Sequence, residues 1–393
     1  MQVVILAAGK GTRMRPLTDN RPKPMLPVAD RPLCAHTADA AVDAGATELI
    51  FVIGYEADHV KSYFGEQYRG VPVSYGNQEE QRGTAHAVRA VADRLDGAFA
   101  VLNGDDLYAP AGIAELLDGA PAVGTYEVDS PSEYGVFDIE GDRIDGIVEK
   151  PVDPPSNLIN VGAYAFPAAA KNWLDVPVSE RGEHELTDVL ARTIAECNVQ
   201  AVRMDRWLGV GRPWELLAAN EWKLGLLERE LRGKVAADAQ LRGRVIIEEG
   251  ATIEPGVVIE GPTLVRSGAS VGPNAFIRGA TLLCENVHVG HAVEVKNSVI
   301  MAGTNVPHLS YVGDSVLGRD VNLGAGTTVA NLRHDGEPVE FTVKGQRVST
   351  GRRKFGIVAG DGTRTGIDTS VDAGVCLSTD ARTGPGETIT RDR

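Results

Sequence analysis

The 393-residue sequence is short of basic residues and of cysteine, and it contains no long apolar run. Its 39 Lys plus Arg stand against 54 Asp plus Glu, which gives a formal net charge of −15 at pH 7. Nucleic-acid binding is not expected, because phosphate contacts need a basic surface. No segment approaches the roughly 20 consecutive apolar residues of a membrane-spanning helix, and no leader-like segment precedes the first apolar run. We therefore expect a cytoplasmic protein with no nucleic-acid or membrane partner.

The four cysteines are widely separated in the sequence. None of them forms a Cys-x-x-Cys pair, the spacing typical of zinc sites and thiol redox motifs. The spacing therefore disfavours a structural zinc ion or a disulfide framework. Buried free thiols are the simpler interpretation for Cys34, Cys197, Cys284 and Cys376.

Up to about residue 230, short apolar runs alternate with stretches of helical periodicity. The expected strands span residues 3–6, 48–53, 98–102 and 122–126, and the expected helices span residues 33–44 and 84–95. This β-α-β alternation predicts a largely parallel sheet that binds ligands beyond the carboxyl ends of its strands. An amphipathic pattern over residues 213–231, which opens with Pro213, predicts a connecting helix.

The last part of the chain is organised by a repeat of six residues. Apolar residues recur at this step from Ile247 to Met301, through Ile253, Ile259, Val265, Val271, Ile277, Leu283, Val289 and Val295. The step fails over a gap of ten that holds Pro307-His308, and it resumes at Tyr311, Leu317, Leu323 and Val329. A second excursion, residues 331–355, precedes Ala359, Thr365, Val371, Leu377, Thr383 and Ile389. Such a repeat predicts a left-handed parallel β-helix, and its interruptions are where we expect function.

The first expected strand leads into a glycine-rich and basic loop. The segment reads Leu6-Ala7-Ala8-Gly9-Lys10-Gly11-Thr12-Arg13-Met14, and Lys23-Pro24 follows. Residues 1–23 carry five basic side chains against one acidic side chain, the reverse of the whole chain. Glycines after a strand allow backbone N–H groups to face an anion, and the basic side chains add charge. The loop lacks the P-loop pattern, and Met14 replaces the last glycine of the dinucleotide-binding fingerprint.

These motifs resemble the signature of the sugar-1-phosphate nucleotidylyltransferases, L-A-A-G-x-G-T-R followed by K-P. With the hexapeptide repeat, the resemblance covers nearly the whole chain and is closer to the bifunctional N-acetylglucosamine-1-phosphate uridylyltransferase/glucosamine-1-phosphate acetyltransferases and their archaeal relatives. It implies an α/β nucleotidyltransferase domain with a Rossmann-like mixed sheet at residues 1–212. A connecting helix at 213–232 and a left-handed β-helix, acetyltransferase-like domain at 233–393 would follow.

The resemblance also implies a reaction for the first domain. An oxygen of a sugar-1-phosphate, N-acetylglucosamine-1-phosphate or glucose-1-phosphate, would attack the α-phosphate of UTP or dTTP and release pyrophosphate, with Mg²⁺ offsetting the developing charge. Arg13 would hold the triphosphate, Lys23 the phosphates at the reacting centre, and Asp105 the metal. The implied nucleotide-binding residues are Leu6, Ala8, Gly9, Gly11, Gln78, Gly83 and Thr84, and the implied sugar-binding residues are Gly135, Glu149 and Asn160.

One position departs from the family's pattern. The family usually supplies a second metal-binding carboxylate in the frame W-x-D-x-G-x-P, whereas this chain has Gly209 between Trp207 and Pro213. A glycine has no side chain with which to coordinate Mg²⁺, so either Asp205 or water replaces the ligand or the transferase is impaired. On the sequence alone we expect weakened but detectable nucleotidyl transfer, which Gly209→Asp would increase.

In the hexapeptide half, the resemblance implies acetyl transfer from acetyl-CoA to an amino-sugar-1-phosphate. His308 would take a proton from the attacking amine, a role that suits an imidazole. Homotrimers with sites between subunits are implied as well, consistent with closed cyclic symmetry. The implied sugar-phosphate residues are Arg278, Lys296, Tyr311 and Asn322, and the implied acetyl-CoA residues are Ala325, Asn331 and Lys354 or Arg353.

Two other functions compete with a bifunctional enzyme. In the first, the nucleotidyltransferase is active and the β-helix serves only for trimerisation, which the His308 segment argues against. In the second, the protein is a noncatalytic sensor of sugar nucleotides. Gly209 is the one feature that favours a sensor, whereas the basic loop, Lys23, Asp105 and His308 favour catalysis.

Overall fold

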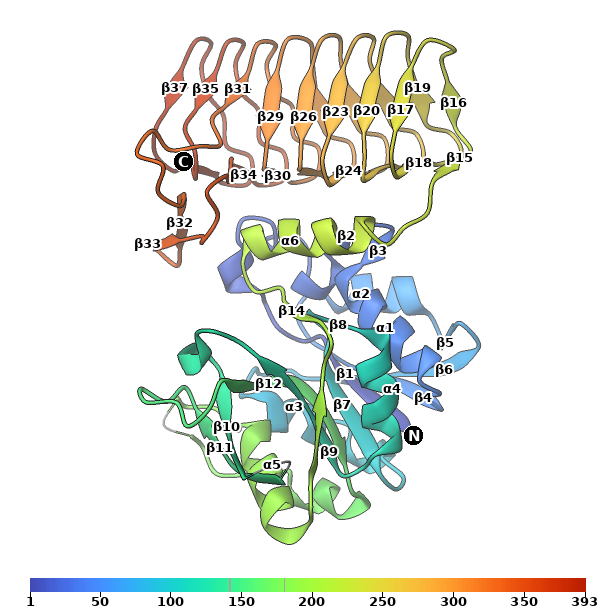
Figure 1. The fold of residues 1–393 in the computed structure, drawn as a ribbon, viewed down its shortest axis with the longest axis vertical. Helices are drawn as coiled ribbons and strands as arrows, with labels where there is room; N and C mark the ends of the chain where they lie inside the picture. Colours follow the sequence, from blue (N-terminus) through green and yellow to red (C-terminus); the bar gives the residue numbers. More distant parts are fainter. Residues whose placement is uncertain (141–142, 180) are drawn as a thin grey trace. The chain divides into compact units, whose positions relative to one another are not determined.

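The computed structural model describes residues 1–140, 143–179 and 181–393, and the chain divides into two compact units (Figure 1). The first unit comprises Met1–Lys10, Arg21–Met25 and Pro32–Gly209, and the second comprises Gly11–Asn20, Leu26–Arg31 and Val210–Arg393. In the described part of the chain, no helix has the length and apolar character needed to cross a membrane.

A ten-stranded mixed sheet forms the centre of the first unit, in the order β10-β11-β13-β9-β12-β7-β1-β4-β6-β5. Strand β1 (Gln2–Leu6) runs parallel to both of its neighbours, β4 (Glu48–Ile53) and β7 (Phe99–Asn103). Strand β12 (Leu158–Phe166) runs antiparallel to β7 and β9 (Ala122–Glu127), which makes the sheet mixed. The other strands are β5 (Gln67–Tyr68), β6 (Val71–Asn77), β10 (Gly135–Glu140), β11 (Arg143–Glu149) and β13 (Gln200–Arg203).

Two apolar clusters cover the two faces of this sheet, because neighbouring strand residues point to opposite sides. Val3 and Ile5 of β1 belong to one cluster, with α1 (Leu33–Asp43), α2 (Ala57–Phe64) and α4 (Pro110–Asp118). Val4 belongs to the other cluster, with α3 (Thr84–Arg89) and α5 (Leu186–Glu196). The helix α3 is shorter than the helix expected over residues 84–95, and a separate 3-10 turn, η3 (Ala92–Arg94), follows it.

Short elements complete the first unit. The strands β8 (Asp106–Tyr108) and β14 (Trp207–Gly209) pair with each other outside the main sheet. The 3-10 helices are η2 (Lys23–Met25), η4 (Pro131–Glu133) and η5 (Ala168–Trp173).

The second unit is a parallel β-helix with three sheets (Figure 1). In the first coils, partners in neighbouring strands lie 18 residues apart, as in Ile253 beside Val271 and Val271 beside Val289. Three steps of six make one coil, so the register confirms the predicted hexapeptide β-helix. One sheet contains β15 (Glu230–Leu231), β18 (Val245–Ile247), β21 (Thr263–Val265), β24 (Thr281–Leu283), β27 (Val299–Ile300), β30 (Val316–Leu317), β34 (Val358–Ala359) and β36 (Cys376–Leu377).

The other two sheets have the same parallel arrangement. The shorter one contains β16 (Lys234–Val235), β19 (Thr252–Ile253), β22 (Ser270–Val271), β25 (His288–Val289) and β28 (Asn305–Val306). The longer one contains β17 (Gln240–Arg242), β20 (Val258–Glu260), β23 (Phe276–Arg278), β26 (Glu294–Lys296), β29 (Tyr311–Gly313), β31 (Thr328–Val329), β35 (Ser370–Val371) and β37 (Thr388–Ile389).

The predicted interruption around His308 is wrong in its position. Val306 pairs with Val289, and Val312 pairs with Val295, each 17 residues apart. The repeat therefore continues through this segment with two steps of five, from Val295 to Ile300 and from Val312 to Leu317, rather than with a gap of ten. The second excursion is confirmed, since it contains the antiparallel hairpin of β32 (Glu340–Val343) and β33 (Gln346–Ser349).

The helix expected over residues 213–231 is also shorter in the structure. Helix α6 (Pro213–Leu224) ends at Gly225, and β15 begins the β-helix a few residues later. Trp214 of α6 meets Phe341 and Phe355 edge to face, with ring centroids 6.1 Å from each. The excursion that contains the hairpin thus packs against α6 within the second unit. The second unit also contains the short elements η1 (Thr12–Met14), β2 (Pro27–Val28) and Arg31 of β3 (Arg31–Pro32).

Candidate active sites

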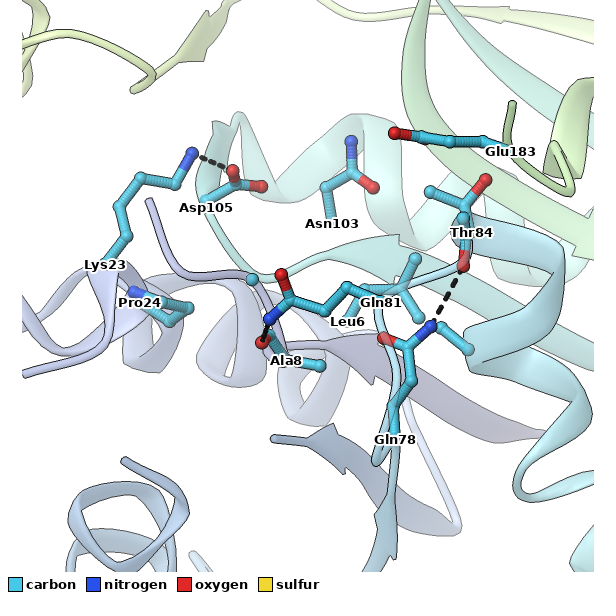
Figure 2. Close-up of a pocket in the computed structure, with 13 residues that line it drawn as sticks. Leu6, Ala8, Lys23, Pro24, Gln78, Gln81, Thr84, Asn103, Asp105 and Glu183 are labelled. Atoms are coloured by element: carbon cyan, nitrogen blue, oxygen red, sulfur yellow. Dashed lines mark hydrogen bonds and ion pairs between the residues drawn. The ribbon is translucent and has the colours of Figure 1, made fainter. Parts of the chain in front are cut away.

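A pocket of about 300 Å³ opens at the carboxyl ends of β1, β6 and β7 (Figure 2). Parallel strands expose backbone groups and helix termini at this edge, which is where α/β sheets bind ligands. Eight predicted site residues line the pocket: Leu6, Ala8, Gly9, Lys23, Gln78, Gly83, Thr84 and Asp105. The structure therefore brings together the glycine-rich loop after β1, called the phosphate loop below, the segment 78–85 with the predicted residues Gln78, Gly83 and Thr84, called the base-reading loop below, and the predicted metal ligand Asp105.

Lys23 and Asp105 form an ion pair at one side of this pocket (Figure 2). Lys23 is buried at the start of η2, whereas Asp105 follows β7 and retains about a third of its side-chain exposure. A buried ammonium group thus lies next to a more exposed carboxylate at one edge of the sheet. Such a pair can hold phosphate oxygens and a hard cation side by side.

Asp106 lies directly across from Gly209. The two residues are register partners in the β8–β14 pair, and a Cβ atom on Gly209 would lie 3.3 Å from Asp106 Oδ1. Asp106 Oδ2 accepts a hydrogen bond from Asn103 Nδ2 at 3.1 Å. Burial, reinforced by the charge of Asp105, raises the pKa of Asp106 to about 8. The carboxyl group of Asp106 thus occupies the space in front of Gly209, whereas Asp205, the candidate replacement from the sequence, is exposed.

The base-reading loop is held against a second segment of the chain. His184 N donates to Arg82 O at 2.7 Å, and Ala85 N donates to His184 O at 2.9 Å. Between these two bonds, Gly83 adopts φ 112° and ψ 174°, and a Cβ atom there would overlap the backbone of His184. Only glycine fits this position, since the conformation is one that side chains rarely adopt.

The three predicted sugar-binding residues form a separate group. Gly135 and Glu149 are partners in the β10–β11 pair, and a Cβ atom on Gly135 would lie 3.6 Å from Asn160 Cβ. Glu149 Oε1 accepts a hydrogen bond from Arg181 Nη1 at 2.8 Å, and Asn160 Nδ2 donates to the Tyr164 hydroxyl at 2.7 Å. They meet each other, but they do not line the pocket that contains Lys23.

In the β-helix, four predicted residues meet at one edge of the sheet that contains β29. Lys296 forms an ion pair with Asp314 at 2.5 Å, and Asn331 Nδ2 donates to Asp314 Oδ2 at 2.6 Å and to the Tyr311 hydroxyl at 3.1 Å. Arg278 lies one coil before Lys296 as its register partner. Asn331, predicted for acetyl-CoA, thus belongs to the same cluster as three predicted sugar-phosphate residues.

The other predicted acetyl-transfer residues lie elsewhere on the β-helix. His308 is exposed at the turn between β28 and β29, and Gly326 N, next to Ala325, donates to His308 O at 3.2 Å. Asn322 continues the sheet of β28, and Lys354 is exposed at a bridge to the excursion. Within the described residues of one chain, no hydrogen bond or ion pair joins the side chains of His308, Asn322 and Lys354 to the Lys296 cluster, although Phe355 N, next to Lys354, donates to Asn331 O at 3.0 Å.

Comparisons with known proteins give the family. The family model for nucleotidyl transferase matches residues 2–224, and a model for the GMPPB C-terminal domain matches residues 259–355. The chain is 40% identical to "Bifunctional protein GlmU" from Methanocaldococcus jannaschii, covering 100% of this chain and 95% of that protein. It is 36% identical to "Bifunctional sugar-1-phosphate nucleotidylyltransferase/acetyltransferase" from Sulfurisphaera tokodaii, covering 100% and 98%.

The chain belongs to the bifunctional sugar-1-phosphate nucleotidylyltransferase/acetyltransferase family. Among solved structures, a putative glucose-1-phosphate thymidylyltransferase from Bacillus anthracis is similar, with a TM-score of 0.52 and 27% identity over 56% of this chain and 94% of that one. Membership of the nucleotidylyltransferase/acetyltransferase family makes the protein an enzyme and confirms the resemblance found in the sequence.

Sequence reasoning missed several side chains of the nucleotidylyltransferase pocket. Gln81 Nε2 donates to Ala8 O at 2.6 Å, which joins the base-reading loop to the phosphate loop (Figure 2). Glu183 and Asn103 line the pocket as well. Gln81 lies between two predicted nucleotide-binding residues, Gln78 and Gly83, so its position in the sequence was a usable signal. Glu183 lies 102 residues further along the chain than Gln81, and no sequence signal connects it to the pocket. Arg13 and Gly11 belong to the second unit, so their roles stay predictions.

Proposed function

We propose that the first unit transfers a uridylyl or thymidylyl group from UTP or dTTP to a sugar-1-phosphate, N-acetylglucosamine-1-phosphate or glucose-1-phosphate, and releases pyrophosphate. The observation that carries this proposal is the single pocket shared by the phosphate loop, Gln78, Gly83 and the Lys23–Asp105 pair. Leu6 to Gly9 would cradle phosphates with backbone N–H groups. Lys23 would hold the oxygens of the α-phosphate as negative charge develops there.

The residues present fit Mg²⁺. This ion is commonly held by one or two carboxylates together with substrate phosphates, and it keeps several waters. Asp105 faces the pocket, and Asp106 lies in front of Gly209, where the family pattern expects a carboxylate. We infer that these two aspartates would hold Mg²⁺, which when bound offsets charge on the reacting phosphates. This pairing weakens the case for a noncatalytic sensor, since that case rests on Gly209.

We further propose that the second unit acetylates an amino-sugar-1-phosphate with acetyl-CoA. The Arg278–Lys296 cluster offers two cations on neighbouring coils for a sugar phosphate. His308 is exposed and would accept the proton of the attacking amine. Because His308 and the cluster are separate in one chain, a homotrimer would complete each site with residues of a second copy. Analytical ultracentrifugation should then give three times the 41.7 kDa mass of one chain.

The test is a two-part assay of the purified protein with Mg²⁺. Pyrophosphate release is followed over pairs of nucleoside triphosphates and sugar-1-phosphates, and free CoA is followed with acetyl-CoA and glucosamine-1-phosphate. We expect both products. Pyrophosphate without CoA would leave the β-helix as a trimerisation domain. If neither pyrophosphate nor CoA is released while the ligands still raise the melting temperature of the protein, the result would favour a noncatalytic sensor.

A further inference from the structure

The side-chain amide of Gln78 is held in one orientation. Gln78 is buried just after β6, and its Nε2 atom lies 3.1 Å from Gly83 O and 3.2 Å from His86 Nδ1. An amide nitrogen can only donate, so both of its N–H groups are used and His86 Nδ1 must accept. That acceptor requires a neutral imidazole with its proton on Nε2.

The consequence is that Gln78 presents its carbonyl oxygen to the pocket. Nε2 of this amide faces Gly83 O, and Figure 2 shows Oε1 on the other side of the amide, towards Gln81 and Leu6. Within the described part of the chain, no residue donates a hydrogen bond to this oxygen. Turning the amide by half a rotation would put Oε1 against Gly83 O, which can only accept, and the hydrogen bond to that carbonyl would be lost. It would also require the proton of the His86 ring to move to Nδ1, so the flip is disfavoured.

A carbonyl acceptor that faces N3 of the base selects among the pyrimidines. The ring nitrogen N3 of uracil and thymine carries a proton, whereas N3 of cytosine is an acceptor in the neutral base. We propose that His86 is a positioning residue that fixes the Gln78 amide and so makes the pocket select nucleotides with a uracil or thymine base over cytosine. This inference rests on the proposed function, because it assumes that the base lies beside Gln78.

The surroundings of His86 favour the neutral ring. Burial comes first among the causes that lower its pKa, followed by the charges of Arg89 and Arg82 and by His184. The centroid of the His184 ring lies 6.3 Å from that of His86. The charge of Glu80 acts in the opposite direction and raises the pKa of His86. Protonation at acid pH would turn Nδ1 from an acceptor into a donor. The reversed amide would then gain a partner, and selection of uracil over cytosine would weaken.

The experiment measures binding of UTP and of CTP to the full-length protein by isothermal titration calorimetry, without sugar phosphate. A pocket that must pair with a base N–H rejects the analogue that lacks it, and one such contact is worth about a factor of 10 to 100. We expect wild type at pH 8 to prefer UTP by at least this factor. His86→Ala should reduce the preference about tenfold by weakening UTP binding.

Two variants separate positioning from a merely structural role. His86→Asn keeps an acceptor near the place of Nδ1 but does not titrate, so it should retain the preference for UTP at pH 8 and at acid pH. Wild type should lose part of its preference once the pH falls through the lowered pKa of His86. His59→Ala, on α2, is the matched control and should bind both nucleotides as wild type does. Where turnover is detected, His86→Ala should raise the KM for UTP and leave kcat within about twofold, since Lys23 and Asp105 are untouched.

The outcomes that overturn the inference are distinct from failure of the proposed function. Equal affinity of wild type for UTP and CTP, or an unchanged preference in a folded His86→Ala protein, would overturn it. A pH-independent preference in wild type would do the same. A protein that binds UTP selectively but releases no pyrophosphate would contradict the proposed transfer reaction while supporting the role of His86.

Discussion

Gly83→Ala should lower the stability of the first unit and distort the nucleotide pocket, and both effects should be larger than those of Gly97→Ala. The backbone at Gly83 has φ 112°, and a Cβ atom would lie 2.6 Å from His184 N and 2.9 Å from His184 C. The backbone conformation alone costs an alanine about 1–3 kcal/mol, and the overlap with backbone adds about 1–3 kcal/mol. We expect a loss of about 2–6 kcal/mol, or a melting temperature roughly 5–20 °C lower.

The same substitution should also weaken UTP binding by at least about tenfold, because a shifted loop loses the bond from Gln78 to Gly83 O. Gly97→Ala is the matched control. Gly97 has φ 86°, yet nothing lies within 4 Å of the added Cβ, so this variant carries the backbone cost without the overlap. Thermal melts and calorimetric UTP titrations of both variants provide the measurement. If Gly83→Ala has the same melting temperature as Gly97→Ala and binds UTP as wild type does, the predicted overlap between an alanine side chain and the backbone of His184 is refuted.

Two further predictions concern charged groups. Asp106→Asn should raise the Mg²⁺ concentration needed for half-maximal pyrophosphate release about tenfold. Adding Gly209→Asp to the same chain should return this concentration to the wild-type value, because the two positions face each other. If the double variant shows no such recovery, the proposed placement of Mg²⁺ is contradicted. Burial is the largest single influence on the pKa of Glu285 and would raise it, but the charge and hydrogen bond of Arg266 at 2.7 Å, together with a backbone hydrogen bond and the charge of Arg319, lower the pKa. A carboxylate with a lowered pKa stabilises the fold at neutral pH, and this stabilisation is lost as the pH falls through that pKa. Glu285→Gln should therefore flatten the decline of the melting temperature between about pH 5 and pH 3. An unchanged decline would show that the Arg266–Glu285 pair does not contribute to stability.

The period of six was visible in the sequence because each coil of the β-helix repeats the same inward positions. Its local register was not. Counting by six from Val295 reaches Met301, whereas the strand positions are Ile300, Val306 and Val312. Met301 is itself buried, so an apolar residue stood where the count expected one. Composition cannot distinguish a shortened coil from an inserted loop, and the pairing of neighbouring coils decides it.

The nucleotide pocket was predictable wherever its residues follow strands in recognisable motifs, as Gly9, Gln78 and Asp105 do. Contacts between distant segments were not predictable. The position of Asp106 opposite Gly209 depends on the pairing of β8 with β14, which the sequence does not reveal. The role of His86 depends on a hydrogen bond to a side chain eight residues earlier, across a loop whose path is set by His184.

The central claim is that one chain holds two separate active sites, and a separation of the two reactions tests it most directly. Pyrophosphate and CoA release should be measured side by side for wild type, Lys23→Ala and His308→Ala. We expect Lys23→Ala to lose pyrophosphate release and retain CoA release. His308→Ala should lose CoA release by a factor of about 10² to 10⁴, the usual contribution of a general base, and retain pyrophosphate release. Equal loss of both products in either variant, or full activity of both variants in both reactions, would contradict the account.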